Sequence, residues 1–208
     1  MEETNRLQFE TECWSRGYTA VAGIDEVGRG CLFGDVVAAA VIMPVGFILE
    51  GVNDSKQLSE KKRDLLYEEI LKTATSWSVA RVDAATIDRI NIRQASRLAM
   101  KKAVEALSVK PDYLLVDAES VELDTNQTAI VKGDFLSQSI GAASIVAKVT
   151  RDRLCQEVWD TLHPGYGIAG HKGYGTKEHR EAIIRLGPTP MHRQSFLKGL
   201  YVVQQELF

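Results

Sequence analysis

Three apolar segments of this chain each run directly into acidic side chains. The acids are Asp25 and Glu26 after residues 19–24 (TAVAGI), Asp117 after residues 113–116 (YLLV), and Asp134 after residues 128–133 (TAIVKG). In an open α/β sheet, neighbouring strand ends lie side by side, so these segments would bring four carboxylates into one site. A cluster of this kind needs cations, and hard oxygen ligands favour Mg²⁺ or Mn²⁺.

Two such cations, about 4 Å apart, would activate a water molecule and stabilise a leaving oxygen, so no Ser or Cys nucleophile is required. The acidic segments therefore predict phosphodiester hydrolysis. For any one of the acids, the alternative is that it merely caps a strand or a turn, which is a common role for Asp. The threefold recurrence favours the metal site.

The glycine-rich turn Gly28-Arg29-Gly30 follows the first acidic pair. Without side chains, its glycines let backbone amides approach a phosphate or sugar closely, and Arg29 adds positive charge. A second loop, residues 172–176, presents Tyr174 between glycines, which suits stacking on a sugar or base. For each loop taken alone, a tight hairpin turn or a mobile loop is an equal or better explanation.

The elements that would position these residues alternate between strand and helix after an initial hairpin, which predicts an α/β fold with a mixed sheet. Ser59 is a candidate N-cap for a helix with Leu65, Leu66 and Ile70 on one face, and Asn91 is another. The predicted strands span residues 19–24, 36–44, 76–83, 113–117 and 128–134, and the predicted helices span 59–74, 92–107, 139–162, 176–187 and a segment from 196.

Length and composition indicate one globular unit. The chain has 208 residues, 45% of them hydrophobic, and a formal net charge of -3. From Lys148 onward, nine Lys and Arg face six Asp and Glu, a net of +3 against -6 for the rest. This asymmetry suits an enzyme that holds cations in one place and phosphates in another, although a chance scatter of surface charge explains it equally well. The polar start and the absence of a long apolar run predict a cytoplasmic protein with no membrane contact.

Cys13, Cys31 and Cys155 are odd in number and far apart, which argues against both a disulfide framework and a zinc site. We expect reduced, packed thiols. The default for the histidines His171, His179 and His192 is likewise a structural role, although each could approach a substrate.

Seven blocks, in order along nearly the whole chain, together resemble bacterial ribonuclease HII, the type 2 ribonuclease H. They are GIDEVGRG at 23–30, NDSKQLS at 53–59, LLVD at 114–117, KGD at 132–134, SIGAASIVAKVTRDR at 139–153, HKGYGTKEH at 171–179 and PMHRQSF at 190–196. The resemblance implies a ribonuclease H-like fold with a five-stranded mixed sheet flanked by helices. It also implies a leader at 1–18, a catalytic core at 19–162 and a loop and helical extension at 163–208 that completes the substrate site.

The resemblance further implies hydrolysis of RNA in RNA–DNA hybrids and nicking on the 5′ side of single ribonucleotides in duplex DNA, with Mg²⁺ or Mn²⁺, leaving 3′-hydroxyl and 5′-phosphate ends. The family's four catalytic, metal-binding carboxylates correspond to Asp25, Glu26, Asp117 and Asp134. Its junction-sensing residues correspond to Gly28, Arg29, Gly30 and Tyr174. A 2′-hydroxyl is the only mark of a ribonucleotide in a DNA backbone, so amides of this turn can recognise it. Phosphate contacts in matching blocks would be Lys56, Lys148 and Arg151, with salt-bridged surface cations as the equal alternative.

The chain departs from the family pattern at four positions. Cys31, Phe33 and Asp35 stand where Pro, Ala and Pro are expected, and Ala118 stands where Gly commonly follows the catalytic Asp. None of these changes removes a catalytic group, but Asp35 adds an acid near the turn that would alter metal or phosphate affinity.

The C-terminal residues Gln204, Leu207 and Phe208 resemble the Gln-x-x-Leu-Phe peptide by which bacterial repair proteins dock on the sliding clamp. The favoured alternative is the end of an amphipathic helix packed on the domain. We expect a monomer. Two other functions remain open: another two-metal nuclease on the same fold, such as a DNA resolvase, and a non-catalytic hybrid-binding protein, against which the four intact acids count.

Overall fold

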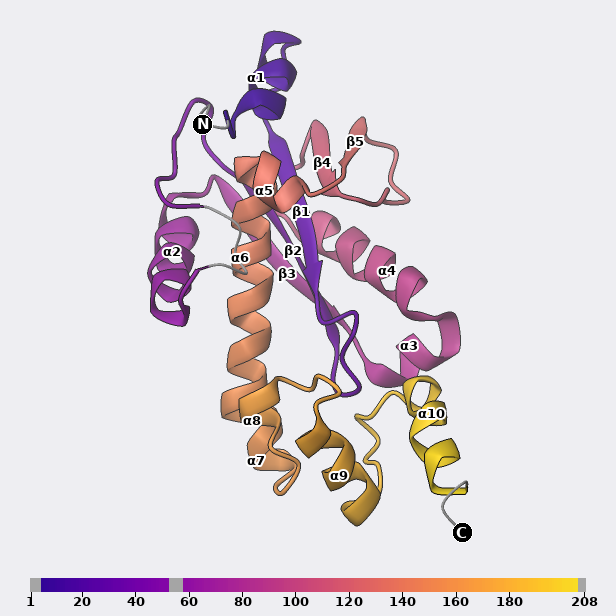
Figure 1. The fold of residues 1–208 in the computed structure, drawn as a ribbon. Helices are drawn as coiled ribbons and strands as arrows, with labels where there is room; N and C mark the ends of the chain where they lie inside the picture. Colours follow the sequence, from indigo (N-terminus) through magenta and orange to yellow (C-terminus); the bar gives the residue numbers. More distant parts are fainter. Residues whose placement is uncertain (1–4, 53–57, 206–208) are drawn as a thin grey trace.

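A five-stranded mixed sheet organises the computed structural model, which describes residues 5–52 and 58–205, with side chains described as far as residue 200 (Figure 1). The strands are β1 (Val21–Val27), β2 (Val36–Ile42), β3 (Ser76–Val82), β4 (Tyr113–Asp117) and β5 (Gln127–Ile130). The helices are α1 (Gln8–Ser15), α2 (Glu60–Thr73), α3 (Ala84–Ile90), α4 (Ile92–Glu105), α5 (Gly133–Leu136), α6 (Gln138–Arg153), the π-helical η1 (Leu154–Trp159), α7 (Asp160–Leu162), α8 (Ile168–His171), α9 (Lys177–Leu186) and α10 (Gln194–Gln205). The predicted α/β class is confirmed.

The strand order is β3-β2-β1-β4-β5. β1, β2 and β3 form an antiparallel meander, and β4 and β5 add to β1 in parallel. The parallel register pairs Ile24 of β1 with Val116 of β4. The next residues of these strands, Asp25 and Asp117, are therefore neighbours at the same end of the sheet.

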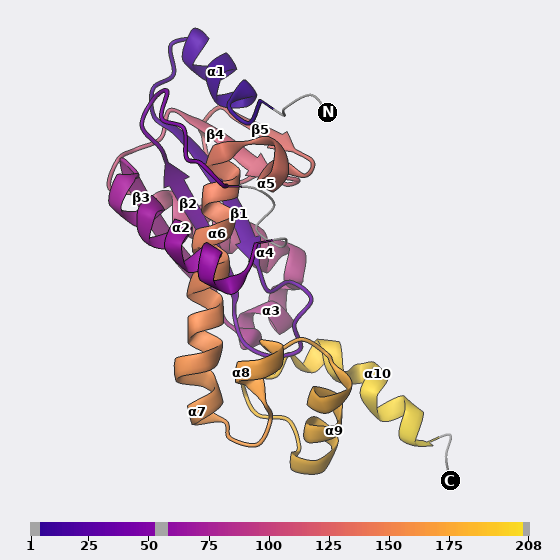
Figure 2. The ribbon, with the colours of Figure 1, turned by 60° about the vertical axis from the view of Figure 1, so that its left-hand side comes forward.

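Helices cover both faces of the sheet. The buried face of α4 carries small residues such as Ala95, Ala99 and Ala103, which allow it to pack closely on β1 and β2. On the opposite face, α2 and α6 pack around Ile70 and Ile145 (Figure 2). Gly23 sets the approach of α6 to β1, because a Cβ atom built on it would lie 2.0 Å from the carbonyl carbon of Ser139. A side chain here would push the long helix away from the strand that carries the acids.

Helix α1 shows that residues of the expected leader pack on the sheet. Cys13 lies in an apolar cluster with residues of β1, β4 and α6. The buried carboxylate of Glu10 accepts hydrogen bonds from Ser137 Oγ (2.6 Å) and from the backbone N–H of Ser139 (2.9 Å). An anion at a helix N-terminus is favourable, so Glu10 fixes the start of α6.

The C-terminal helices α7 to α10 form a separate layer beyond one end of the sheet (Figures 1 and 2). Their cluster includes Trp159, Ile168, Ile183 and Leu197, and Phe33 from the loop after β1 inserts into it. Phe33 stands where the family pattern has Ala, and its fully buried side chain fills this cluster. In the described part of the chain, no helix is long and apolar enough to cross a bilayer.

Four local predictions were wrong. Asp25 and Glu26 lie within β1, which continues to Val27, because this strand pairs with β2 on its other side. β5 ends at Ile130, and Asp134 lies in the short helix α5. Leu65 of α2 is 65% exposed, so it does not belong to the buried face. The long helix predicted from residue 139 to 162 loses its α-helical hydrogen bonding at η1. Helix α3 was not predicted.

Ala118, the residue after β4, has a left-handed backbone with φ of 51°. This conformation is costly for an L-residue with a side chain and free of that cost for glycine, which explains why glycine is the expected residue here. We predict that Ala118→Gly raises the free energy of unfolding by about 0.5–1 kcal/mol, as measured by urea denaturation. Ala106→Gly is the matched control, because Ala106 is also exposed but has φ of -87°. A loss of stability at both positions would contradict the explanation.

Candidate active site

The acids of β1 and β4 open into a cavity of about 270 Å³ at the end of the sheet that faces the C-terminal layer. Its lining comes from β1, the turn after it, β4, α6 and the loop between α8 and α9. The lining residues are Asp25, Glu26, Val27, Gly28, Arg29, Asp117, Ser144, Lys148 and Tyr174. Three of the four predicted acids and most of the predicted substrate contacts therefore share one cavity.

Asp25 is the deepest of these acids, with 6% of its surface exposed. One of its carboxylate oxygens accepts a hydrogen bond from the backbone N–H of Glu26 (2.7 Å), and Ser144 on α6 donates another to it. Burial, followed by the negative charges of Glu26 and Asp117, raises the pKa of Asp25 well above its usual range. A deprotonated Asp25 is thus costly until a positive charge enters the cavity.

Glu26 is held by Arg29, whose guanidinium donates to Glu26 Oε1 at 3.0 Å. Burial raises the pKa of Glu26, and the hydrogen bond and charge of Arg29 oppose that rise. The second oxygen, Oε2, is buried and has no hydrogen-bond partner among the described residues. A buried carboxylate oxygen of this kind is an available ligand.

Asp117 and Asp134 are linked through a backbone amide. The N–H of Gly133 donates to Asp117 Oδ1 at 2.7 Å, and Asp134 is the next residue along the chain. Asp134 is 7% exposed, and its carbonyl oxygen accepts a hydrogen bond from Arg6 at 2.6 Å. Its side chain does not line the cavity, so the structure places this predicted acid beside the site rather than in its wall.

The donor set fits a hard divalent cation in kind. Three carboxylates meet in a cavity where two of them have raised pKa values, and Glu26 Oε2 is unsatisfied. No three Asp, Glu, His or Cys side chains of the described residues converge on one point as a finished metal cage. Arg29 contacts one oxygen of Glu26, and the N–H of Gly133 contacts one oxygen of Asp117. A cation bound at Oε2 would therefore share Glu26 with Arg29, which contacts Oε1.

The turn after β1 follows two different constraints. Gly28 has φ of 93°, and a Cβ atom built on it would lie 2.3 Å from Arg151 Nε. Gly30 has open space around its Cβ position. Gly28 is thus required by the fold, whereas the absence of a side chain at Gly30 leaves room for a ligand beside the cavity.

Arg151 differs from its prediction as a phosphate contact. Its side chain is fully buried and donates to the carbonyl oxygens of Phe33 (3.0 Å), Asp35 (3.1 Å) and Lys172 (2.8 Å). With no exposed surface, it cannot reach a phosphate, and it instead ties the loop after the glycine turn to the loop before Tyr174. Arg193, which the sequence analysis did not single out, precedes α10 and holds the same loop by donating to the carbonyl oxygens of Gly34 and Arg29. A guanidinium group has five N–H donors and no acceptor, so these carbonyl oxygens satisfy it in the interior.

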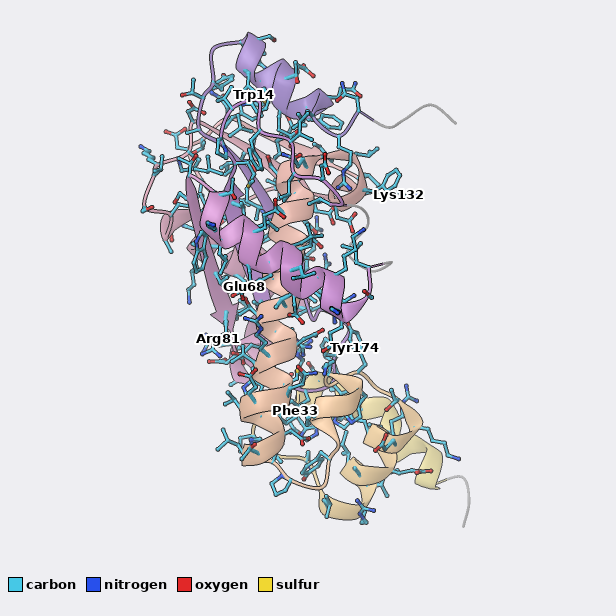
Figure 3. The ribbon with its side chains drawn as sticks, turned by 90° about the vertical axis from the view of Figure 1, so that its left-hand side faces the viewer. Trp14, Phe33, Glu68, Arg81, Lys132 and Tyr174 are labelled. Atoms are coloured by element: carbon cyan, nitrogen blue, oxygen red, sulfur yellow. The ribbon has the colours of Figure 1, made fainter. Side chains whose placement is uncertain are left out.

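The other predicted contacts have varied positions. Lys148 lines the cavity and also donates to Asp152 at 2.8 Å. Tyr174 lines it with 41% of its surface exposed, and Figure 3 shows it where the C-terminal layer meets the rest of the molecule. Asp35 does not line the cavity, because its carboxylate lies 3.7 Å from Arg81. Lys56, Leu207 and Phe208 lie outside the described residues, as does the side chain of Gln204.

The three thiols and two of the histidines are buried in the interior. Cys13, Cys31 and Cys155 are buried free cysteines, as expected. His179 and His192 are also fully buried, and burial lowers the pKa of each to about 4. Both are therefore neutral at neutral pH. Val27 and Ser144 are the cavity residues that the sequence analysis missed. Ser144 lies in the block at 139–153, but a serine within an apolar helix carries no signal of its own.

Comparison with known proteins identifies the family. A family model described as ribonuclease HII matches residues 22–199. The chain is 59% identical over 202 residues to ribonuclease HII of Alkaliphilus metalliredigens, covering 94% of this chain and 98% of the relative. It is 55% identical over 188 residues to ribonuclease HII of Solibacter usitatus, covering 90% and 82%.

Solved structures have the same fold. The crystal structure of ribonuclease H2 from Pyrococcus horikoshii has a TM-score of 0.74 at 24% identity, covering 89% of this chain and 99% of the other. Ribonuclease HII from Archaeoglobus fulgidus, solved in complex with PCNA, has a TM-score of 0.68 at 27% identity, covering 84% and 94%. The chain therefore belongs to the ribonuclease HII family of metal-dependent endoribonucleases.

Proposed function

We propose that this enzyme nicks duplex DNA on the 5′ side of an embedded ribonucleotide and hydrolyses the RNA strand of RNA–DNA hybrids, leaving 3′-hydroxyl and 5′-phosphate ends. One observation carries the proposal. The acids Asp25, Glu26 and Asp117 share a single cavity with Gly28 and Arg29 of the glycine turn and with Tyr174. Groups suited to hydrolysis thus lie directly beside groups suited to reading a sugar.

The residues that would hold Mg²⁺ or Mn²⁺ are Asp25, Glu26, Asp117 and Asp134. When bound, such cations supply a more acidic water molecule and neutralise charge on the scissile phosphate. Asp25 is positioned for this role by Ser144 and by the amide of Glu26, and Asp117 by the amide of Gly133. Asp134 would join them by a movement of α5, because its side chain does not line the cavity.

Substrate selection is assigned to the other wall of the cavity. Backbone groups of Gly28, Arg29 and Gly30 form hydrogen bonds with the 2′-hydroxyl. The open space at Gly30 admits the sugar. If the carboxylate of Glu26 bound a cation, the guanidinium of Arg29 would be available to contact a phosphate. Tyr174 stacks on the deoxyribose of the following nucleotide, where a second 2′-hydroxyl would obstruct it. Lys148, and Lys56 from its matching block, would contact phosphates.

A substrate panel tests this proposal. Labelled duplexes of one sequence, carrying either one ribonucleotide, a full RNA strand or DNA alone, are incubated with Mg²⁺, with Mn²⁺ or with EDTA. We expect cleavage of the first two substrates with either cation, no cleavage of DNA and no cleavage in EDTA. Equal cutting of DNA would instead indicate a resolvase-like nuclease. Tight hybrid binding without cleavage would indicate a non-catalytic binding protein.

We also propose that residues 204–208 bind a sliding clamp. The supporting observations are the Gln-x-x-Leu-Phe pattern and the relative from Archaeoglobus fulgidus that was solved in complex with PCNA. Deletion of residues 204–208 should abolish binding to a bacterial clamp and leave cleavage of a short duplex unchanged. Equal clamp binding by the intact and shortened chains would reject this contact.

A further inference from the structure

Two buried histidines connect the loop before α10 to the backbone of Tyr174. His179 Nε2 and His192 Nε2 are 3.3 Å apart, in a region where neither side chain is reached by solvent. The outer nitrogen of each ring meets a backbone group. His192 Nδ1 lies 2.9 Å from the nitrogen of Thr189 and 3.0 Å from the hydroxyl of the same residue, which itself accepts from the N–H of Met191. His179 Nδ1 lies 2.9 Å from the carbonyl oxygen of Tyr174.

These end groups determine which nitrogen carries the proton in each ring. The backbone N–H of Thr189 can only donate, so His192 Nδ1 is the acceptor and its proton lies on Nε2. The carbonyl oxygen of Tyr174 can only accept, so His179 Nδ1 carries the proton and its Nε2 is the acceptor. At the shared contact, His192 Nε2–H therefore donates to His179 Nε2. Donor and acceptor agree at all three contacts.

This order requires both rings to be neutral. A proton added to His179 would leave two N–H groups facing each other at the shared contact, and one added to His192 Nδ1 would face the N–H of Thr189. Burial lowers the pKa of both histidines, and the rings around them are Phe33, Tyr166 and His171, none of which offers a negative charge. Neutral rings are thus the expected state under the conditions in which a nuclease acts.

This chain of hydrogen bonds ends at the backbone of Tyr174, a residue that lines the cavity. Tyr174 also forms an isolated β-bridge with Cys31, and His192 forms one with Phe33. The segments that carry Tyr174 and His192 therefore both pair with the loop that follows the glycine turn. The carbonyl oxygen of Tyr174 accepts a second hydrogen bond from the N–H of Thr176 at 2.9 Å. Two donors on one carbonyl fix the orientation of this peptide, and with it the direction in which the tyrosine side chain leaves the backbone.

We infer that His179 and His192 are positioning residues, which hold Tyr174 against the cavity through a directional chain of hydrogen bonds. The inference deepens the proposed function, because it rests on Tyr174 contacting the substrate. The tautomer order itself does not depend on that role.

The tautomers can be measured directly in the full-length wild-type protein without substrate. In ¹⁵N-labelled protein at neutral pH, long-range ¹H–¹⁵N correlations distinguish protonated from unprotonated ring nitrogens. We expect Nδ1–H for His179, the less common tautomer, and Nε2–H for His192. Finding Nε2–H for His179, or a doubly protonated ring at either position, would contradict this order of hydrogen bonds.

A double-mutant cycle tests the positioning role. The amide nitrogen of Asn is placed like Nδ1 and that of Gln like Nε2, so His179→Asn keeps the bond to Tyr174 and His179→Gln loses it. We expect His179→Gln to lower kcat/KM on the single-ribonucleotide duplex by about tenfold, as Tyr174→Ala does, and His179→Asn to lower it less. In the Tyr174→Ala background, His179→Gln should have no further effect.

The outcomes separate the two ideas. If Tyr174→Ala cleaves like the wild type, the proposed role of Tyr174 fails, whatever the tautomers. If Tyr174→Ala is impaired but His179→Gln is not, or if the two losses multiply, the positioning role fails. Thermal melts of each variant show whether a loss reflects misfolding. If a variant does not fold, the tautomer measurement in the wild type still tests the order of the hydrogen bonds.

Discussion

Asp25→Asn is expected to abolish cleavage and, at the same time, to make the protein more stable. The carboxylate of Asp25 is the deepest in the cavity and has Glu26 and Asp117 as charged neighbours. Loss of one cation ligand should lower kcat/KM at least about a hundredfold, which corresponds to about 2.7 kcal/mol of transition-state stabilisation. Substrate binding should persist, because the glycine turn and Tyr174 are unchanged.

The gain in stability follows from the raised pKa of Asp25. The folded protein holds the Asp25 proton more tightly than the unfolded chain, so the free energy of unfolding decreases as pH rises from the usual Asp range through the raised value. Asn carries no charge and removes this loss. The melting temperature of Asp25→Asn should exceed that of the wild type by about 3–6 °C at pH 8, equivalent to about 1–2 kcal/mol, and the gain should vanish below about pH 4.

Calorimetry without divalent cations, at several pH values, measures this effect. Asp124→Asn is the control, because Asp124 is exposed and does not line the cavity, and it should change neither cleavage nor the melting temperature. Mg²⁺ should raise the melting temperature of the wild type and not that of Asp25→Asn. An Asp25→Asn protein that is less stable at pH 8, or that cleaves normally, would contradict the proposed arrangement.

Gly28→Ala is expected to lower the free energy of unfolding strongly, whereas Gly30→Ala should leave the stability unchanged and impair only cleavage. At Gly28, the left-handed backbone and the short approach to Arg151 oppose any side chain. Arg151 is itself held by three carbonyl groups and cannot move aside easily. The cost should be about 3 kcal/mol in the free energy of unfolding.

Gly30→Ala is the matched variant two residues away. Its new methyl group meets no atom of the described residues within 4 Å, so we expect a change of less than about 0.5 kcal/mol in stability. If a sugar approaches the backbone there, the methyl group should lower cleavage at a single ribonucleotide by about tenfold or more. Wild-type cleavage by Gly30→Ala would show that no close approach occurs at this residue, and a wild-type melting temperature for Gly28→Ala would refute the steric argument.

The sequence predicts best what depends on local pattern. Ser59 and Asn91 cap α2 and α4 as expected, because an N-cap needs only its own side chain and nearby N–H groups. The meeting of Asp25 with Asp117 also follows from the sequence, since alternating strands and helices imply that distant strands become parallel neighbours.

The sequence predicts less well what depends on long-range contacts. Arg151 has the residue type and the position of a phosphate ligand, but loops more than 100 residues earlier in the chain provide carbonyl groups that bury it. The tautomers of His179 and His192 likewise depend on which backbone groups the fold brings to their outer nitrogens. Asp134 lies on a helical turn rather than a strand, because β5 ends once its pairing with β4 is complete at Ile130.

In the proposed function, the carboxylates of the cavity hydrolyse the phosphodiester next to the turn that senses a 2′-hydroxyl. The most direct test is to map, at nucleotide resolution, the products of a duplex that contains one ribonucleotide, with wild type and Asp25→Asn side by side in Mg²⁺. We predict one nick on the 5′ side of the ribonucleotide, with a 3′-hydroxyl and a 5′-phosphate, and none with Asp25→Asn. Cleavage on the 3′ side, a cyclic 2′,3′-phosphate end, or equal nicking by both proteins would contradict it.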